Sequence, residues 1–364
     1  WRSWPTFLGQ HSPPVESSQP LMSPCEMSES MECFMAKLAG KRVVLSGCGG
    51  GSDVLGTSVI YAQIKDVAKQ VIFFSLTFTS DAILNKTCQK VSRKCWRVDP
   101  NNAAIAKDPE EKVYFPEARM ARVTGVPIYT MSHHATIQEY TEGYQAALQL
   151  ELGQGDSLWR SMGCALGLLE AKPQTTAALA DVLVLCDGGC DVLLTGLETG
   201  LATPVEDMAH LKAVLPLDIP EKYIMALGAN VDCGHGVVQA ELDCRLDVLY
   251  NSGSMIFRQP IELEHAAGAY FAELVLRCSP ACSIVQSLVL AAMQGYRGKF
   301  TPEHLKSRIG HNVVPLTEQT CTLFCFHLSS VAEEVVYLPR LKPDFGFLQV
   351  ASEIGAFQAE LEQN

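Results

Sequence analysis

The sequence is short of basic residues and of long apolar runs. Lys and Arg number 28 and Asp and Glu number 40, which gives a formal net charge of -12 over 364 residues. Nucleic acid would be repelled by that average field, so we expect no nucleic acid partner. The longest uncharged stretch, 278–296, is interrupted by Ser, Pro and Gln. A bilayer demands about 20 consecutive apolar residues, so we expect no membrane partner either.

Patterns for zinc sites and disulfide frameworks are also missing. The chain has 14 cysteines, and the pairs four apart at 186/190, 278/282 and 321/325 lack the closer spacing or His partner of a zinc site. Scattered cysteines without a recognisable secretory signal favour reduced thiols that pack as small apolar side chains. We therefore predict a cytoplasmic protein that binds a small molecule, with homo-oligomerisation left open.

Short apolar runs alternate with helical patterns along most of the chain. We predict strands at 42–46, 70–76, 181–185, 223–227 and 322–326, and helices at 136–152, 262–277 and 302–309. Continuously apolar strands that alternate with helices are typical of a parallel sheet covered on both faces. The predicted fold class is α/β, with a doubly wound, mostly parallel, Rossmann-like sheet and helices on both faces.

Composition divides the chain into three segments. Residues 1–35 are rich in Ser and Pro, and we expect a flexible leader there. Residues 36–345 are expected to form a single Rossmann-like α/β domain. An alternative is two related halves that meet near 150–180, where several glycines weaken the helical pattern. Residues 346–364 are expected to form a C-terminal helix or tail.

The first predicted strand runs directly into the glycine-rich turn GCGGGSD at 47–53. Such a turn lets a ligand approach the backbone, and the start of the next helix favours an anion. We expect the turn to bind ligand through Gly47, Gly49, Gly50, Gly51 and Ser52. Ser52 replaces the third glycine of the dinucleotide fingerprint, and a GKS or GKT triphosphate loop is absent. Asp53 places a carboxylate where an anion would dock; the alternative is a tight turn in which Ser52 or Asp53 caps the helix.

The first turn recurs in the middle of the chain. Segments 50–57 and 188–195 are identical at six of eight positions, and each follows an apolar strand. A turn that needed only flexibility would have no reason to carry the same aspartate twice. We therefore assign catalytic roles to Asp53 and Asp191. The second turn adds the expected ligand-binding residues Gly188, Gly189 and Asp187.

Acidic residues gather around the second turn. Asp187, Asp191 and Glu198 could hold Mg²⁺ or act as acids and bases. The alternative is that both aspartates shape the turn and Glu198 is a solvated helix residue. Thr203 and Glu206 are predicted to form a capping box at the next helix.

Two further features carry polar side chains. The turn 228–236 contains Asp232 and His235, which we predict to be a catalytic pair for proton transfer, because loops at strand ends carry catalytic groups. A basic cluster follows the second strand and comprises Lys86, Lys90, Arg93, Lys94 and Arg97. It either receives the ribose phosphate of a dinucleotide or forms a solvated helix face.

These motifs resemble an uncharacterised, mainly archaeal family of Rossmann-like proteins. The family has a GxGGGxDV loop and a mid-chain DxGGDxLxxGxE segment followed by S/T-P-x-x-D. The corresponding residues here are Asp187, Gly188, Gly189, Asp191, Leu193, Gly196, Glu198, Thr203, Pro204 and Asp207. This chain departs from the pattern at Cys190, and it lacks the glutamate of a GxDGE-type segment near Asp232. The resemblance covers residues 40–340 and implies a Rossmann-like fold without an assigned reaction.

Three functions follow as expectations. The leading one is an enzyme that acts on a nucleotide-like or phosphorylated small molecule through the two GGxDV loops, with a nucleotide or Mg²⁺ as the cofactor. The second is an NAD(P)-dependent oxidoreductase. The third is a non-catalytic scaffold or sensor that binds a metabolite.

Overall fold

The computed structural model describes residues 29–106, 113–152, 180–278, 283–309 and 313–363. Most of the predicted leader lies outside the described residues. So does the stretch 153–179, where the two predicted halves would meet.

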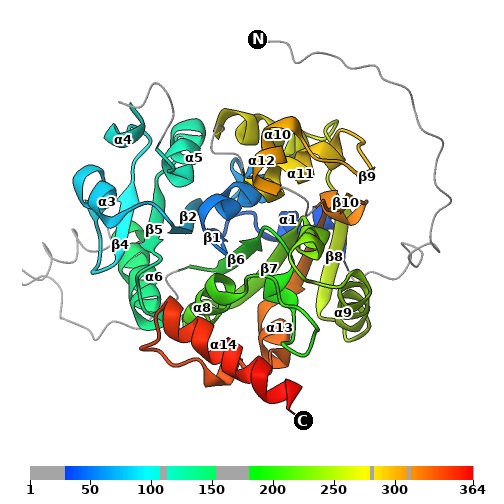
Figure 1. Ribbon diagram of the computed structural model, residues 1–364. Helices are drawn as coiled ribbons and strands as arrows, with labels where there is room; N and C mark the ends of the chain where they lie inside the picture. Colours follow the sequence, from blue (N-terminus) through cyan, green and yellow to red (C-terminus); the bar gives the residue numbers. More distant parts are fainter. Residues whose placement is uncertain (1–28, 107–112, 153–179, 279–282, 310–312, 364) are drawn as a thin grey trace, which may run out of the picture.

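Nine of the described strands form one sheet in the order β3-β4-β5-β2-β1-β6-β7-β11-β8 (Figure 1), and two short strands, β9 and β10, form a separate antiparallel pair. The bounds of the strands in the sheet are β1 Arg42–Gly47, β2 Gln70–Thr77, β3 Gln89–Lys90, β4 Cys95–Val98, β5 Ile128–Ser132, β6 Val182–Asp187, β7 Glu221–Leu227, β8 Met255–Pro260 and β11 Thr322–His327. The central strands β5, β2, β1, β6 and β7 run parallel, and antiparallel strands flank them at both edges. The predicted α/β fold with a mostly parallel sheet is confirmed.

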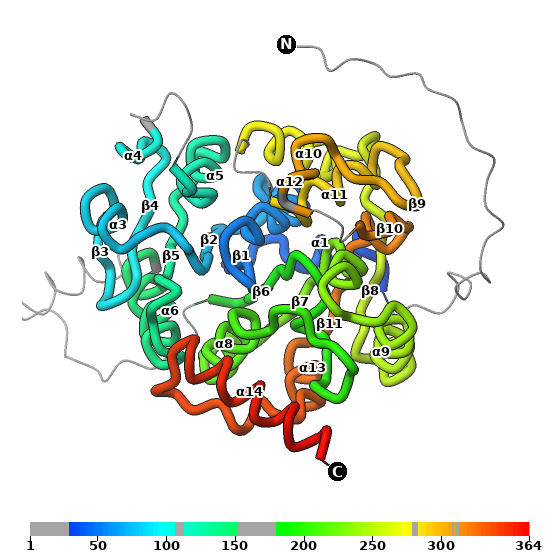
Figure 2. Tube along the Cα trace, viewed as in Figure 1, coloured from blue at the N-terminus to red at the C-terminus, as the bar shows by residue number. Residues whose placement is uncertain are grey.

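The order of the parallel strands creates a break in the winding. The chain moves from β1 outward to β2 and β5, and then returns to the other side of β1 with β6 and β7 (Figure 2). This is the third-second-first-fourth-fifth order of a doubly wound sheet. The loops that follow β1 and β6 diverge at such a switch point and leave a crevice beyond the carboxyl ends of the strands.

Helices cover both faces of the sheet (Figure 1). One face carries α1 (Met31–Lys37), α2 (Ser58–Ile64), α5 (Pro116–Thr124), α10 (Ala266–Cys278) and α11 (Ile284–Met293). The other carries α6 (Ile137–Leu152), α8 (Val205–Val214), α9 (Gln239–Asn251), α13 (Leu328–Glu334) and α14 (Phe347–Glu362). Val43 and Leu45 of β1 pack on the first layer and Val44 packs on the second. Strands buried on both sides explain the unbroken apolar runs in the sequence.

Shorter elements complete the described chain. They are α3 (Asp81–Thr87), α4 (Ala103–Ala106), α12 (Lys306–Ile309), β9 (Gly298–Lys299), β10 (Pro315–Leu316), and the 3-10 helices η2 (Gly51–Thr57), η3 (Asp191–Leu193), η4 (Ala229–Gly234), η5 (Glu303–Leu305), η6 (Gln319–Cys321) and η7 (Leu338–Arg340). The predicted helix at 302–309 is therefore two short pieces. Among the described helices, none is long and apolar enough to span a membrane.

Helix α1 begins at Met31, within the segment 1–35 that was predicted to be a flexible leader. The Cys33 N–H donates to the Ser30 side-chain oxygen (3.2 Å), which caps the helix. Phe34 is 2% exposed and meets the Tyr223 ring edge to face, with 4.9 Å between centroids. The expected leader boundary at residue 35 is thus corrected, because the apolar side of 31–35 packs on the sheet.

Replacing Phe34 tests how firmly α1 is attached. Phe34→Ala removes a buried ring that packs on Tyr223 and Phe257, so we expect the free energy of unfolding to fall by about 3 kcal/mol. Urea denaturation measures it. Cys33→Ala, at an exposed position of the same helix, is the matched control. Equal stability of the two variants would contradict the packing of α1.

Candidate functional site

A pocket of about 740 Å³ opens at the carboxyl ends of the central strands. Asp53 reaches it from the loop after β1, Phe78 from the loop after β2, Asp191 from the loop after β6 and Asp232 from the loop after β7. Ala351 and three other residues of α14 line another side. The pocket therefore occupies the crevice at the switch point, where ligands bind in open α/β sheets.

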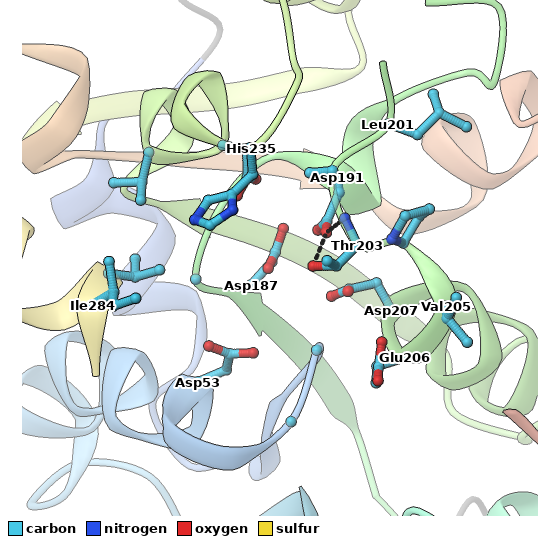
Figure 3. Close-up of a pocket in the computed structure, with 18 of the residues that line it drawn as sticks. Asp53, Asp187, Asp191, Leu201, Thr203, Val205, Glu206, Asp207, His235 and Ile284 are labelled. Atoms are coloured by element: carbon cyan, nitrogen blue, oxygen red, sulfur yellow. Dashed lines mark hydrogen bonds between the residues drawn. The ribbon is translucent and has the colours of Figure 1, made fainter. Parts of the chain in front are cut away.

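Carboxylates dominate this pocket. Its aspartates are Asp53, Asp187, Asp191, Asp207 and Asp232. Figure 3 shows Asp53, Asp187, Asp191 and Asp207 around one shared space. Single carboxylate oxygens of Asp187, Asp191 and Asp207 lie within 4.8 Å of one another, and these side chains are 3%, 4% and 3% exposed. None of the described residues that line the pocket is Lys or Arg.

Hydrogen bonds fix some of these carboxylates and leave others unpaired. The N–H and hydroxyl of Thr203 donate to Asp191 Oδ2 at 3.3 and 3.4 Å. The Cys190 N–H donates to Asp232 Oδ2 at 2.6 Å. Asp187 Oδ2 and Asp207 Oδ1 are buried without a hydrogen-bond partner in the described structure. Buried oxygens without a partner are unfavourable, so these two are positioned to accept a ligand.

The capping box predicted for Thr203 and Glu206 is wrong. Pro204 takes the N-cap position of α8 without a side-chain hydrogen bond. Thr203 binds Asp191 instead. Ala202, directly before it, has a φ of 54°, a left-handed conformation that costs a residue with a Cβ free energy. This strained turn lies on the wall of the pocket.

The glycines make room for carboxylates. A Cβ atom at Gly49 would lie 2.8 Å from Asp207 Oδ1 and 2.8 Å from Asp53 Oδ2, so those two oxygens are at most twice that distance apart. A Cβ at Gly188 would collide with Asp53. A Cβ at Gly189 would collide with Asp232. The loops need glycine because aspartate side chains fill the space beside their backbones.

Burial and mutual repulsion raise the pKa of the aspartates. Burial first, and then Asp232, raises the pKa of Asp191 to about 7. Burial raises the pKa of Asp232 to about 6, although backbone hydrogen bonds oppose it. Burial and neighbouring carboxylates raise the pKa of Asp187 and Asp207 well above the usual range. The pocket therefore favours bound protons or a bound cation.

The predicted ligand-binding residues divide into two groups. Those that line the pocket are Gly49, Gly50, Ser52, Gly188 and Asp187, with Asp53 and Asp191 beside them. The others, Gly47, Gly51 and Gly189, are not among the lining residues. A Cβ at Gly47 would collide with the Val54 backbone, so this glycine closes the turn.

Glu198 lies outside the group of aspartates. Its carboxylate accepts hydrogen bonds from the N–H groups of Thr195 (2.9 Å) and Gly196 (2.9 Å), which close its own turn. It does not line the pocket. Asp207, from the first turn of α8, takes the third place that the sequence analysis assigned to Glu198.

Asp232 and His235 both line the pocket, but they are not joined as the sequence analysis expected. Asp232 Oδ2 accepts from the Cys190 N–H, and the backbone N–H of His235 donates to the Asp232 carbonyl. The imidazole of His235 is exposed at the rim (Figure 3). It is therefore placed to meet a ligand, and its role in proton transfer with Asp232 stays a prediction.

The basic cluster is not a single helix face. It spreads over α3, β3 and β4 at the sheet edge, and none of its members lines the pocket. Lys94 pairs with Asp81 (2.8 Å), and Arg97 lies 3.6 Å from Glu151. These side chains are engaged with acids of the same protein.

Two parts of the pocket were not predicted from the sequence. Asp207 belongs to the S/T-P-x-x-D segment, and it follows Pro204 by three residues, which places it in the first turn of a helix. That spacing could have marked it as a candidate. Phe78 and Tyr114 also line the pocket, and each is a lone aromatic residue without a sequence signal.

Comparison of the chain with family models, curated proteins and solved structures found no match. The resemblance to the mainly archaeal family stays a prediction. Function is therefore inferred from the geometry of the pocket.

The raised pKa of Asp191 predicts a specific pH dependence of stability. Its unfolded-state pKa is about 3.9, so its contribution is fully present below that pH and is lost as the pH rises through about 7. Without divalent cations, the melting temperature of Asp191→Asn should exceed that of the wild type by several degrees more near pH 8 than near pH 5, because most of the loss falls between these two pH values. Calorimetric melting curves at both pH values measure this.

The comparison with Asp191→Asn cancels the titration of groups that do not interact with Asp191. One such group is His210, whose pKa burial lowers to about 4 without a contribution from Asp191. If the melting temperature of the variant relative to the wild type is the same at pH 5 and at pH 8, the raised pKa of Asp191 is contradicted.

Proposed function

We propose that the pocket binds a divalent cation through Asp187, Asp191 and Asp207, and that the protein is an enzyme that acts on a phosphorylated or nucleotide-like small molecule held by that cation. The observation that carries the proposal is the convergence of three buried carboxylates with no Lys or Arg among the described residues that line the pocket. Carboxylate oxygens are the ligands that Mg²⁺ takes in enzymes whose substrates carry phosphates.

The unpaired oxygens support a cation over protons alone. Asp187 Oδ2 and Asp207 Oδ1 are buried and have no hydrogen-bond partner among the described residues. A proton shared between two of the carboxyl groups would satisfy only the two oxygens that it joins. A divalent cation satisfies several oxygens at once and cancels the repulsion that raises their pKa values.

The same carboxylates argue against direct binding of phosphate by the first glycine turn. Asp53 and Asp207 face Gly49, where a phosphate would approach the loop. The turn also continues into a 3-10 helix, and the α-helix starts only at Ser58. A cation between the carboxylates and the substrate removes this conflict. The NAD(P)-dependent alternative lacks that support, because the basic cluster lies outside the pocket and Arg93, Lys94 and Arg97 are paired with acids.

The proposal gives the other lining residues definite tasks. A bound cation would hold and polarise phosphate oxygens of the substrate. Asp53 and Asp232 lie outside the group of three and have carboxyl groups with raised pKa. Asp232, with a pKa of about 6, can exchange a proton near neutral pH. His235 at the rim can donate to an anionic substrate. We place this chemistry in the cytoplasm, which the unpaired cysteines of the described chain support.

Cation binding is the direct test of this proposal. Titration calorimetry of the full chain with MgCl₂ and with MnCl₂ near pH 8 should show saturable binding. Asp207→Asn and Asp191→Asn should weaken it at least about tenfold, because each removes a charged oxygen ligand and keeps the shape of the side chain.

Glu198→Gln is the matched control. It removes an acidic charge from the same region but outside the pocket, so binding should stay unchanged. Circular dichroism verifies the fold of all three variants. Wild-type affinity in both aspartate variants, or no binding by the wild type, would overturn the proposal.

A further inference from the structure

The pocket has an aromatic end beside its acidic end. Three large aromatic side chains of the described chain are more than a third exposed, namely Phe78 (42%), Tyr114 (40%) and Tyr296 (44%). Phe78 and Tyr114 line the pocket, and Tyr296 does not. Exposed rings are normally spread over a surface, so two in one pocket point to a ligand with an apolar, flat part.

Phe78 lines the pocket, and its ring is in contact with the ring of His133. Its ring lies 5.5 Å from the His133 ring, centroid to centroid, at an angle of 50°. A ring nitrogen of His133, Nδ1, is 3.1 Å from the Thr77 carbonyl, which holds the imidazole in place. This contact fixes Phe78 although its own side chain is exposed.

Tyr114 is fixed next to Phe78. The Thr79 hydroxyl donates to the Tyr114 carbonyl at 2.9 Å and so joins the two segments. A Cβ atom at Gly51 would lie 2.5 Å from the Tyr114 hydroxyl and 3.3 Å from the Phe78 ring. Glycine at 51 therefore allows both aromatic residues to sit over the turn.

The aromatic and acidic ends of the pocket lie beside the same glycine-rich turn, at positions two residues apart. Gly51 lies below the rings, and Gly49 faces Asp53 and Asp207. Cα atoms two residues apart are separated by about 7 Å at most. A ligand that touches both ends thus needs a flat ring and a cation-binding group joined by a short spacer such as one sugar.

We infer that the substrate is a nucleoside phosphate whose base stacks on Phe78 and Tyr114, while its phosphate meets the cation at the aspartates. The inference rests on the proposed function, since the aspartates repel a phosphate in the absence of the cation. Stacking on an aromatic side chain accepts any base, so the rings define the class of the substrate and not the identity of the base.

The experiment compares ligands with and without a base. The full chain, saturated with MgCl₂, is titrated with pyrophosphate and with the diphosphates of adenosine, guanosine, cytidine and uridine. At least one nucleoside diphosphate should bind about tenfold more tightly than pyrophosphate. Phe78→Leu should remove about tenfold of that affinity and leave the binding of pyrophosphate unchanged. Tyr296→Leu, which removes an equally exposed ring outside the pocket, should change neither.

The outcomes separate the inference from the proposed function. If pyrophosphate binds and no nucleoside diphosphate binds more tightly, the aromatic subsite is refuted and the cation site stands. If Phe78→Leu weakens both kinds of ligand equally, Phe78 is only structural and the inference is overturned. If Mg²⁺ itself does not bind, the proposed function fails, and the inference fails with it.

Discussion

Repulsion between carboxylates that are buried side by side constrains the whole pocket. Asp187, Asp191 and Asp207 converge with no Lys or Arg among the described lining residues, and two of their oxygens have no hydrogen-bond partner in that part of the chain. Such an arrangement is unfavourable until protons or a cation bind. The glycine turns follow from it, because Gly49 and Gly188 leave space that carboxylates fill. The strained backbone at Ala202 belongs to the same arrangement, because the N–H of Thr203, the next residue, donates a hydrogen bond to Asp191.

The topology of the sheet explains how residues far apart in the chain reach one pocket. The chain leaves β1 in one direction and returns on its other side with β6, so the turns after these strands face each other across a crevice. The repeated GGxDV segment marks these two turns in the sequence. Each copy follows one of the two strands at the switch point, and each brings one aspartate, Asp53 or Asp191, to the pocket.

The fold could be predicted further than the site. Strands buried on both faces leave unbroken apolar runs, and the runs at the parallel strands β1, β2, β6 and β7 and at the antiparallel strand β11 are visible for that reason. The site depends on contacts across the chain that spacing does not encode. Glu198 matched the motif as well as Asp207 did, but local hydrogen bonds from Thr195 and Gly196 hold Glu198 in its own turn. Phe78 lines the pocket beside His133, and this contact between residues far apart in the chain has no signal in the sequence.

The central claim is that the aspartates form a cation site. Crystals of the full chain grown with MnCl₂ would locate the cation by the anomalous signal of manganese. The account predicts one strong peak, from a manganese ion coordinated by carboxylate oxygens of Asp187, Asp191 and Asp207. The distances from the ion to these oxygens should be about 2.2 Å, which is usual for divalent cations with oxygen ligands. A pocket that holds no anomalous peak at a saturating concentration of manganese, with the three carboxyl groups instead bonded to one another, would contradict it.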